Sequence, residues 1–251
     1  MAIKSGGLVS FVFCTVSLIN IVLGQNTELM AQGLNITSSG KSSGPIEIFA
    51  DDGIEWQQEK NIFIAHGNAK AIRGTVTVMA DVLKAYYRDN DGDTDIWRLD
   101  AEGSVEIRSP SEVAYGDLAI YDVINDLLVL RGDNVRFIAG ADTITARDQI
   151  EYWELKKIAV ARGDAVAVRE DKVVRADVLV GHFTSDVAGS TEVHQIDAFD
   201  NVRIKTANET AEAERGVYHV KAGLAVLTGD VKIVREKNIL TGCKAEVDLN
   251  T

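Results

Sequence analysis

The chain has 251 residues, of which 46% are hydrophobic, and its 38 Asp and Glu outweigh 26 Lys and Arg to give a formal charge of −12. That charge disfavours nucleic acid and anionic membrane surfaces, so no nucleic-acid partner is expected. Only two cysteines are present. One lies in the leader described next, which leaves no intramolecular disulfide for the mature chain, and the fold must be held by burial.

The first 24 residues have the order of a secretory signal. Lys4 precedes an apolar run from Leu8 to Leu23, and the small residue Gly24 follows. We therefore predict a signal peptide over residues 1–24, cleaved after Gly24. The apolar run is also just long enough to stay in the membrane as an anchor, and this alternative remains open.

Residues 25–44 are rich in Gly and Ser and are expected to form a flexible linker. From Pro45 to Thr251 the chain has the signs of strands and lacks those of helices. Apolar residues alternate with polar ones, β-branched residues are frequent, Gly and Asp-Asn punctuate the runs, and only Pro110 interrupts. We expect almost pure β structure over residues 45–251.

Residues 45–251 contain six imperfect copies of one unit with a period of about 32 residues. Each unit has a turn followed by an apolar-x-apolar strand, as in Gly103-Ser-Val105-Glu-Ile107 and Gly229-Asp-Val231-Lys-Ile233. Two further strands complete it. A unit of this size cannot bury its own apolar face, so the units must stack. The predicted fold is all-β, an elongated open β-jelly roll or β-solenoid of stacked short antiparallel strands.

The apolar pairs of the repeated strand are expected to line one interior wall. The wall is either a packed core or a groove that accommodates lipid, and both hold if an incompletely closed sheet shares its interior with a ligand. The candidate lipid-binding residues from this pattern are Val105, Ile107, Val135, Phe137, Val166, Val168, Val202, Ile204, Val231 and Ile233.

Four aspartates recur at the start of the second strand of successive units, at Asp81, Asp117, Asp148 and Asp177. Carboxylates stacked along a β-solenoid form the sites of some polysaccharide-cleaving enzymes, so an enzyme of that class is one alternative. A catalytic cluster should break a repeat rather than follow it, however, and this favours a structural role in turns. We expect no catalysis.

The acidic segment from Asp89 to Asp95 suggests calcium, but Gly92 stands at its fourth position, where an EF-hand loop requires Gly at the sixth. No two of the four histidines stand at the short sequence spacing that is typical of metal ligands. We therefore expect a solvated loop, surface histidines, and neither a metal nor a cofactor.

Several motifs occur together, in order, near the start of the repeats. They are Pro45-Ile46-Glu-Ile48-Phe-Ala50-Asp51, Arg73-Gly74-Thr-Val76-Thr-Val78 and Ala80-Asp81-Val-Leu-Lys-Ala-Tyr86. In this order they closely resemble the start of the OstA-like family of lipopolysaccharide transport. The resemblance is strongest over residues 45–88 and continues more weakly to Thr251.

The resemblance implies a periplasmic β-jelly roll that takes lipopolysaccharide from an inner-membrane-anchored LptC-like protein and passes it to an outer-membrane LptD-like translocon. Lipid A acyl chains would lie in the apolar groove. Ile46 and Ile48 match the family's first apolar pair and are implied contacts of acyl chains or of the upstream subunit, and Val76 and Val78 join the lipid-binding set. A retained anchor would instead make this the membrane-anchored, LptC-like member of the pathway.

The ends of such a stack predict self-association. Each end is a row of unpaired backbone groups, and the last segment, from Ala245 to Leu249, carries no Pro to block it. We expect end-to-end association through these edge strands. A second set of repeats from Gly163 makes the chain longer than a minimal family member.

Overall fold

The computed structural model describes residues 7–8, 36–37, 47–90, 93–110, 112–153, 155–185 and 191–248. The predicted signal peptide and linker lie outside these residues except for two short strands, β1 (Gly7–Leu8) and β2 (Ile36–Thr37), which pair in parallel. Ile46 also lies outside them. One 3-10 turn, η1 (Gln58–Lys60), interrupts the strands that follow.

The other strands form one large sheet. They are β3 (Glu47–Phe49), β4 (Ile54–Gln57), β5 (Ile62–Arg73), β6 (Val76–Asn90), β7 (Asp93–Arg108), β8 (Glu112–Asp122), β9 (Leu127–Arg131), β10 (Val135–Ala139), β11 (Asp142–Ala146), β12 (Gln149–Trp153), β13 (Ile158–Arg169), β14 (Lys172–Ser185), β15 (Thr191–Lys205), β16 (Glu209–His219), β17 (Leu224–Arg235) and β18 (Asn238–Asp248).

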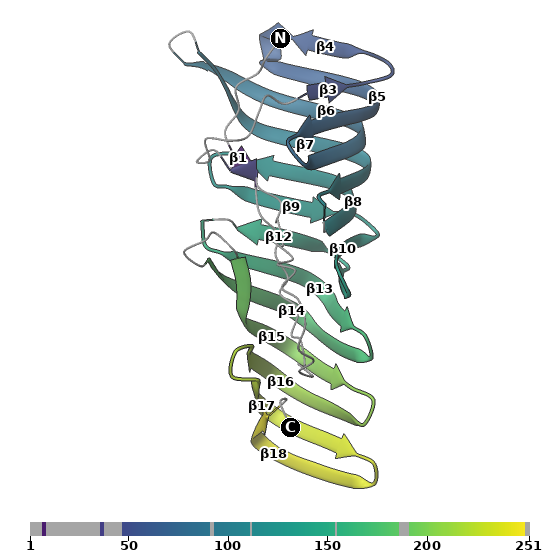
Figure 1. Ribbon diagram of the computed structural model, residues 1–251, viewed down its shortest axis with the longest axis vertical. Coiled ribbons are helices and arrows are strands. Elements are labelled where there is room, and N and C mark those ends of the chain that lie inside the picture. The colour runs from purple at the N-terminus through teal and green to yellow at the C-terminus, as the bar shows by residue number, and fades with distance from the viewer. Residues whose placement is uncertain are drawn as a thin grey trace, which may run out of the picture.

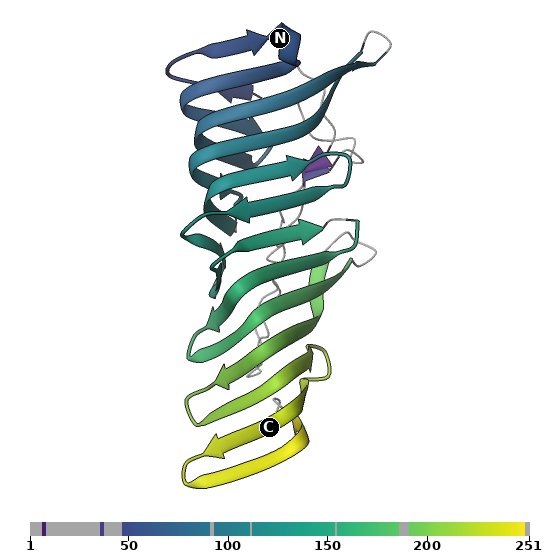
Figure 2. The ribbon, with the colours of Figure 1, turned by 180° about the vertical axis from the view of Figure 1, so that it is seen from behind.

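This sheet has 16 strands, and its neighbours are antiparallel, mostly joined as successive hairpins. The strands stack in nearly the order of the sequence, which makes the molecule long and narrow, with β3 and β4 at one end and β18 at the other (Figure 1). Figure 2 shows the same ladder from behind, with each long strand bent across the stack. The predicted all-β, elongated open jelly roll is confirmed.

The long strands bend at β-bulges. In β7, Gly103 and Ser104 have φ angles of 76° and 47°, and the register against β8 shifts between Glu102 and Val105. Two successive residues in the left-handed region add length to one strand and turn it sharply, as bulges do. The Gly-containing turns expected between short strands are therefore mostly corners inside strands, and two expected short strands join into one of 11–16 residues.

The recurrent aspartates pack at these corners. A Cβ atom at Gly103 would overlap the carboxyl group of Asp81, and one at Gly132 would overlap that of Asp117. The Asp117 carboxylate also accepts a hydrogen bond of 2.8 Å from the backbone N–H of Asp133. Asp81, Asp117 and Asp148 thus have the structural role expected of them, and Asp177 accepts a 2.9 Å hydrogen bond from the Asn201 side chain. The same Cβ overlap relates Asp52 to Gly67, Asp148 to Gly163 and Glu214 to Gly229.

The corners divide the sheet into two walls. Between β8 and β13 the sheet follows two separate paths, one through β10 and β11 and the other through β9 and β12. We call these the first wall and the second wall, and each long strand contributes one half to each. Buried side chains from both walls form one apolar cluster that extends from Val76 to Val231. The interior of the molecule is therefore the space between the two walls.

Candidate lipid-binding interior

An apolar cavity of about 110 Å³ lies between the walls near the N-terminal end of the stack. We call it the N-terminal compartment. Both walls contribute to it, because its lining comes from both halves of strands β5, β6 and β7. Its larger apolar lining residues include Ile48, Phe63, Val76, Val78, Leu83, Leu99 and Ile107.

Short side chains explain why this space is empty of protein. The lining includes five alanines, Ala65, Ala71, Ala85, Ala101 and Ala119, at positions that alternate toward the interior. The methyl groups of alanines on opposite walls are too short to touch across the interior. In a close-packed core, by contrast, side chains from the two sides interdigitate. The cavity thus follows from the residue sizes on a regular backbone.

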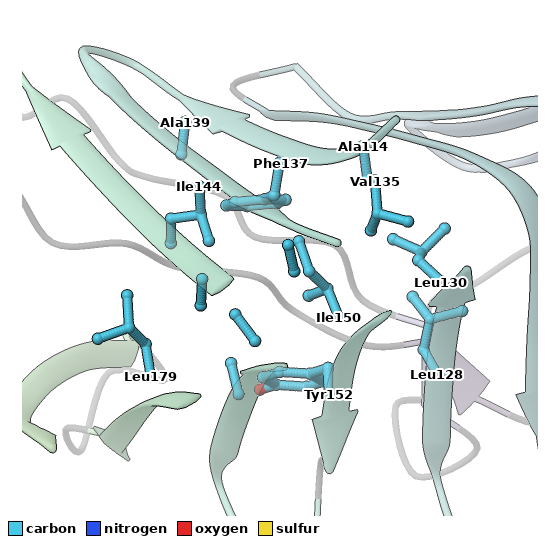
Figure 3. Packing of buried hydrophobic residues seen from close by; sticks show 14 of the residues in the cluster. Ala114, Leu128, Leu130, Val135, Phe137, Ala139, Ile144, Ile150, Tyr152 and Leu179 are labelled. Carbon is cyan, nitrogen blue, oxygen red and sulfur yellow. The ribbon is translucent and has the colours of Figure 1, made fainter. Parts of the chain in front are cut away.

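Large side chains fill the interior where the first and second walls have separate strands. We call this region, β9 to β12, the waist. Leu130 and Tyr152 are 0% exposed and Phe137 is 1% exposed, and Figure 3 shows these side chains gathered between the walls with Leu128 and Ile150. The Tyr152 ring also meets Phe183 edge to face, with 5.9 Å between centroids. A smaller cavity of about 50 Å³ lies on the C-terminal side of the waist, lined by Phe137, Ile144 and Ile150 and otherwise by residues of β13, β14 and β15.

Most of the predicted interior residues face the space between the walls. Ile48, Val76, Val78 and Ile107 line the N-terminal compartment. Val105, Val135, Phe137, Val202 and Val231 are buried in the apolar cluster, and Ile204 and Ile233 pack against it. The structure therefore brings these residues to one continuous interior, as packed core at the waist and as cavity wall near the N-terminal end.

Val166 and Val168 do not face the interior, and their predicted placement is wrong. Their neighbours Ala165 and Ala167 do: Ala165 is 0% exposed, and Ala167 packs against the apolar cluster. In the unit that begins at Gly132, the first inward residue, Val135, is the third residue after the Gly. In the unit that begins at Gly163, the first inward residue, Ala165, is the second residue after the Gly. Because side chains alternate along a strand, this offset of one residue moves the valines to the outer face.

Arg73 and Tyr121 are interior residues that the sequence patterns did not single out. Both line the N-terminal compartment, Arg73 from the first wall and Tyr121 from the second. Burial lowers the pKa of the Arg73 guanidinium, and nearby Tyr121 raises it. Tyr121 is 5% exposed and its hydroxyl donates a 2.8 Å hydrogen bond to Asp126. The sequence held one signal for Arg73: it stands two residues after Ala71 and four after Ala69, on the same side of the strand.

Charged groups on the outer face of the waist neutralise one another. Glu151 accepts hydrogen bonds of 2.6 Å from Arg162 and 2.8 Å from the Trp153 ring, and a further one from Gln149. Burial alone would raise the pKa of Glu151, but these hydrogen bonds outweigh it and hold the pKa below its ordinary value. The waist therefore combines a packed interior with a satisfied polar exterior.

The histidines are less isolated than expected. His182 lies 2.8 Å from an Asp197 carboxylate oxygen, and its ring centroid is 6.1 Å from that of His194. Within the described part of the chain, no group of three or more His, Cys, Asp or Glu is arranged to hold a metal ion. In the same residues, no helix combines the length and apolarity needed to cross a membrane.

Both ends of the stack expose apolar side chains on edge strands. At the N-terminal end Phe49, Ile54 and Trp56 are each more than half exposed, and at the other end Ile239 and Leu240 are 65% and 60% exposed. Among the described strands, β3 and β4 pair only with β5, and β18 pairs only with β17. Each end thus presents unpaired backbone groups beside apolar side chains.

An open, bent β-sheet with an apolar interior defines the class of elongated β-jelly rolls, and comparison with known proteins gives the family. The chain matches the family described as "LptA/(LptD N-terminal domain) LPS transport protein" twice, over residues 47–153 and 143–251. It belongs to this family, whose members are transport proteins. The two matches overlap over residues 143–153, within the waist, so the chain matches the family's domain twice.

A relative and a solved structure give more distant similarity. An uncharacterized protein of Rhizobium meliloti (strain 1021) is 28% identical over 123 residues, which span 47% of this chain and 63% of that protein. The crystal structure of LptH from Pseudomonas aeruginosa, described as the LptA homologous periplasmic component of the lipopolysaccharide transport device, aligns with 17% identity and a TM-score of 0.44. That alignment covers 50% of this chain and 95% of LptH.

Proposed function

We propose that this protein binds lipopolysaccharide in the periplasm by holding lipid A acyl chains between its two walls, and that it conveys the lipid from the inner to the outer membrane without catalysis. The apolar N-terminal compartment supports this proposal most directly, within a family of lipopolysaccharide transport proteins. Each methylene moved from water into such a site contributes about 0.8 kcal/mol, so acyl chains can bind an acidic protein despite their own anionic head group.

The partners we propose follow from the two ends of the stack. The exposed edge strands β3 and β4 would meet an inner-membrane-anchored LptC-like protein or the β18 end of another copy, and β18 would meet another copy or an outer-membrane LptD-like translocon. Backbone hydrogen bonds would continue the sheet across each junction, and interior side chains would continue the groove. The exposed Trp56 and Leu240 support contacts of this kind, because both lie on these edges.

Photo-crosslinking on the two faces of one strand tests the proposal. Val78 lines the N-terminal compartment, and the adjacent Met79 is turned to the outer face of the same strand by alternation. With a photoreactive residue at position 78, we expect a covalent adduct with purified lipopolysaccharide; at position 79 we expect little or none. Equal labelling at both positions, or none at either, would contradict binding between the walls.

A further inference from the structure

Arg73 is placed at the margin of the N-terminal compartment. It ends β5 and continues the inward-facing series of Ala69 and Ala71, so its side chain leaves the first wall on the interior side. The strand begins its first-wall half at the corner near Gly67 and ends at Arg73. The guanidinium therefore lies on the side of the compartment away from the corner, where the two walls are not joined.

Tyr121 marks the facing margin. It lies next to the last residue of β8, in the second-wall half of that strand, and it lines the same compartment. Its hydroxyl proton is donated to Asp126, which holds the ring in place and leaves no proton for another acceptor. Among these marginal groups, the guanidinium is thus the donor that suits an anion.

The second matched region repeats this arrangement with one difference. Arg169 ends the inward series of Ala165 and Ala167. Burial raises the pKa of Tyr218, and the nearby Arg169 opposes this rise only in part. Gly67 and Gly163 are 96 residues apart and Tyr121 and Tyr218 are 97 apart, so the two Arg and Tyr pairs correspond.

The difference between the two regions lies in the surroundings of the arginine. Arg169 forms an ion pair and two hydrogen bonds with Asp142, which is 8% exposed. Arg73 lines the large apolar cavity, whereas Arg169 lines neither of the two cavities described above.

We propose that Arg73 binds the phosphate group of an amphiphile whose acyl chain occupies the N-terminal compartment, and that it selects acidic over neutral amphiphiles. This inference rests on the proposed function. A guanidinium beside an apolar cavity is suited to the task, because it stays charged, offers paired N–H donors to phosphate and gains strength where water is partly excluded. It also supplies a local positive charge on a chain with a formal charge of −12.

Two detergents of equal chain length test the proposal on the full chain. Dodecyl phosphate and dodecyl maltoside are titrated by calorimetry below their micelle concentrations into the wild type, R73Q, R73K and R136Q. Arg136 is the matched control, because it stacks on the Tyr115 ring, 4.2 Å from its centroid, on the outer face. We expect R73Q to weaken the binding of dodecyl phosphate about tenfold, R73K to weaken it less, and R136Q to leave it unchanged. The affinity for dodecyl maltoside should be the same in all four proteins.

The outcomes separate this inference from the proposed function. If both detergents bind the wild type and R73Q changes neither, Arg73 does not recognise phosphate, although binding between the walls stands. The inference is also overturned if R73Q weakens the binding of both detergents equally and R73K restores the affinity for neither. Arg73 would then only maintain the shape of the compartment. If neither detergent binds the wild type, the proposed acyl-chain site fails and this inference fails with it.

Discussion

The N-terminal compartment and the waist share one backbone plan but differ in their interior. Both have antiparallel strands in two walls, with side chains alternating between the interior and the outer face. Alanines line a cavity of about 110 Å³ in the compartment, whereas the side chains of Leu130, Phe137 and Tyr152 are at most 1% exposed in the waist. In a stacked sheet of this kind the backbone follows the same plan in every repeat, so the size of the inward side chains decides whether the interior is a packed core or a cavity.

The difference also suggests a division of labour between the two regions. The waist lies where the two matches to the family's domain overlap, and its buried aromatic side chains hold the walls together where each wall has separate short strands. The compartment contributes less packing and leaves room for a ligand. Stability should therefore depend most on the waist, and ligand binding most on the compartment.

The largest effect is expected at Phe137. Phe137→Ala empties a site that is 1% exposed, and we expect it to reduce the free energy of unfolding by about 3–5 kcal/mol, measured by urea denaturation followed by circular dichroism. Leu83→Ala, on the partly exposed lining of the compartment, is the matched control and should cost less than about 2 kcal/mol. Equal losses at the two positions would remove the contrast between the regions.

Glu151 should make the waist sensitive to acid. Its pKa is lowered in the folded state, so its contribution is present at neutral pH and is lost as pH falls through the folded-state pKa. Glu151→Gln should cost about 1–3 kcal/mol at pH 7 by urea denaturation. The gap between variant and wild type should shrink as the pH is lowered from the ordinary glutamate pKa of 4.5. A gap that is constant from pH 7 to pH 3 would contradict this.

Filling the compartment should separate binding from stability. Ala71→Phe places a ring in existing space, so we expect a change of less than about 1 kcal/mol in unfolding but a loss of lipopolysaccharide crosslinking at position 78. Ala146→Phe, at a 5% exposed site of the waist, should instead cost about 1–3 kcal/mol through overpacking. Undiminished crosslinking in Ala71→Phe would place the ligand elsewhere.

The smallest effect on stability is expected at the C-terminal edge. Leu240→Asp changes an exposed side chain of β18, and unfolding should shift by no more than about 0.5 kcal/mol. Self-association measured by sedimentation should nevertheless weaken, because a charge is added beside the unpaired edge. Leu155→Asp is the control, since Leu155 is 72% exposed and lies outside the strands. Equal weakening by both variants would argue against association through β18.

Much of the fold was predictable because its signals are local. Alternation of apolar residues indicates strands, and in five of the six corner elements a Gly or Asp and the residue after it take the left-handed conformation that these bulges require. The joining of short strands into long ones was not predicted, because a bulge and a hairpin turn use the same residues. At Gly103 the two halves form one strand that bends across a bulge, whereas at Gly132 they are the separate strands β9 and β10, and in both cases the halves pair on different walls.

The sequence by itself determined the strand periodicity, the repeats, the corner residues and the resemblance to a lipopolysaccharide-transport family, because each of these is carried by neighbours in the chain. Only the tertiary structure decided that Ala165 rather than Val166 faces the interior, that Arg73 meets the same cavity as Tyr121, and that the waist is filled while the compartment is not. The physical reason is that a cavity is defined by what faces a side chain across the gap. Those facing residues lie far away in sequence, and one extra residue at a bulge reverses every side chain after it.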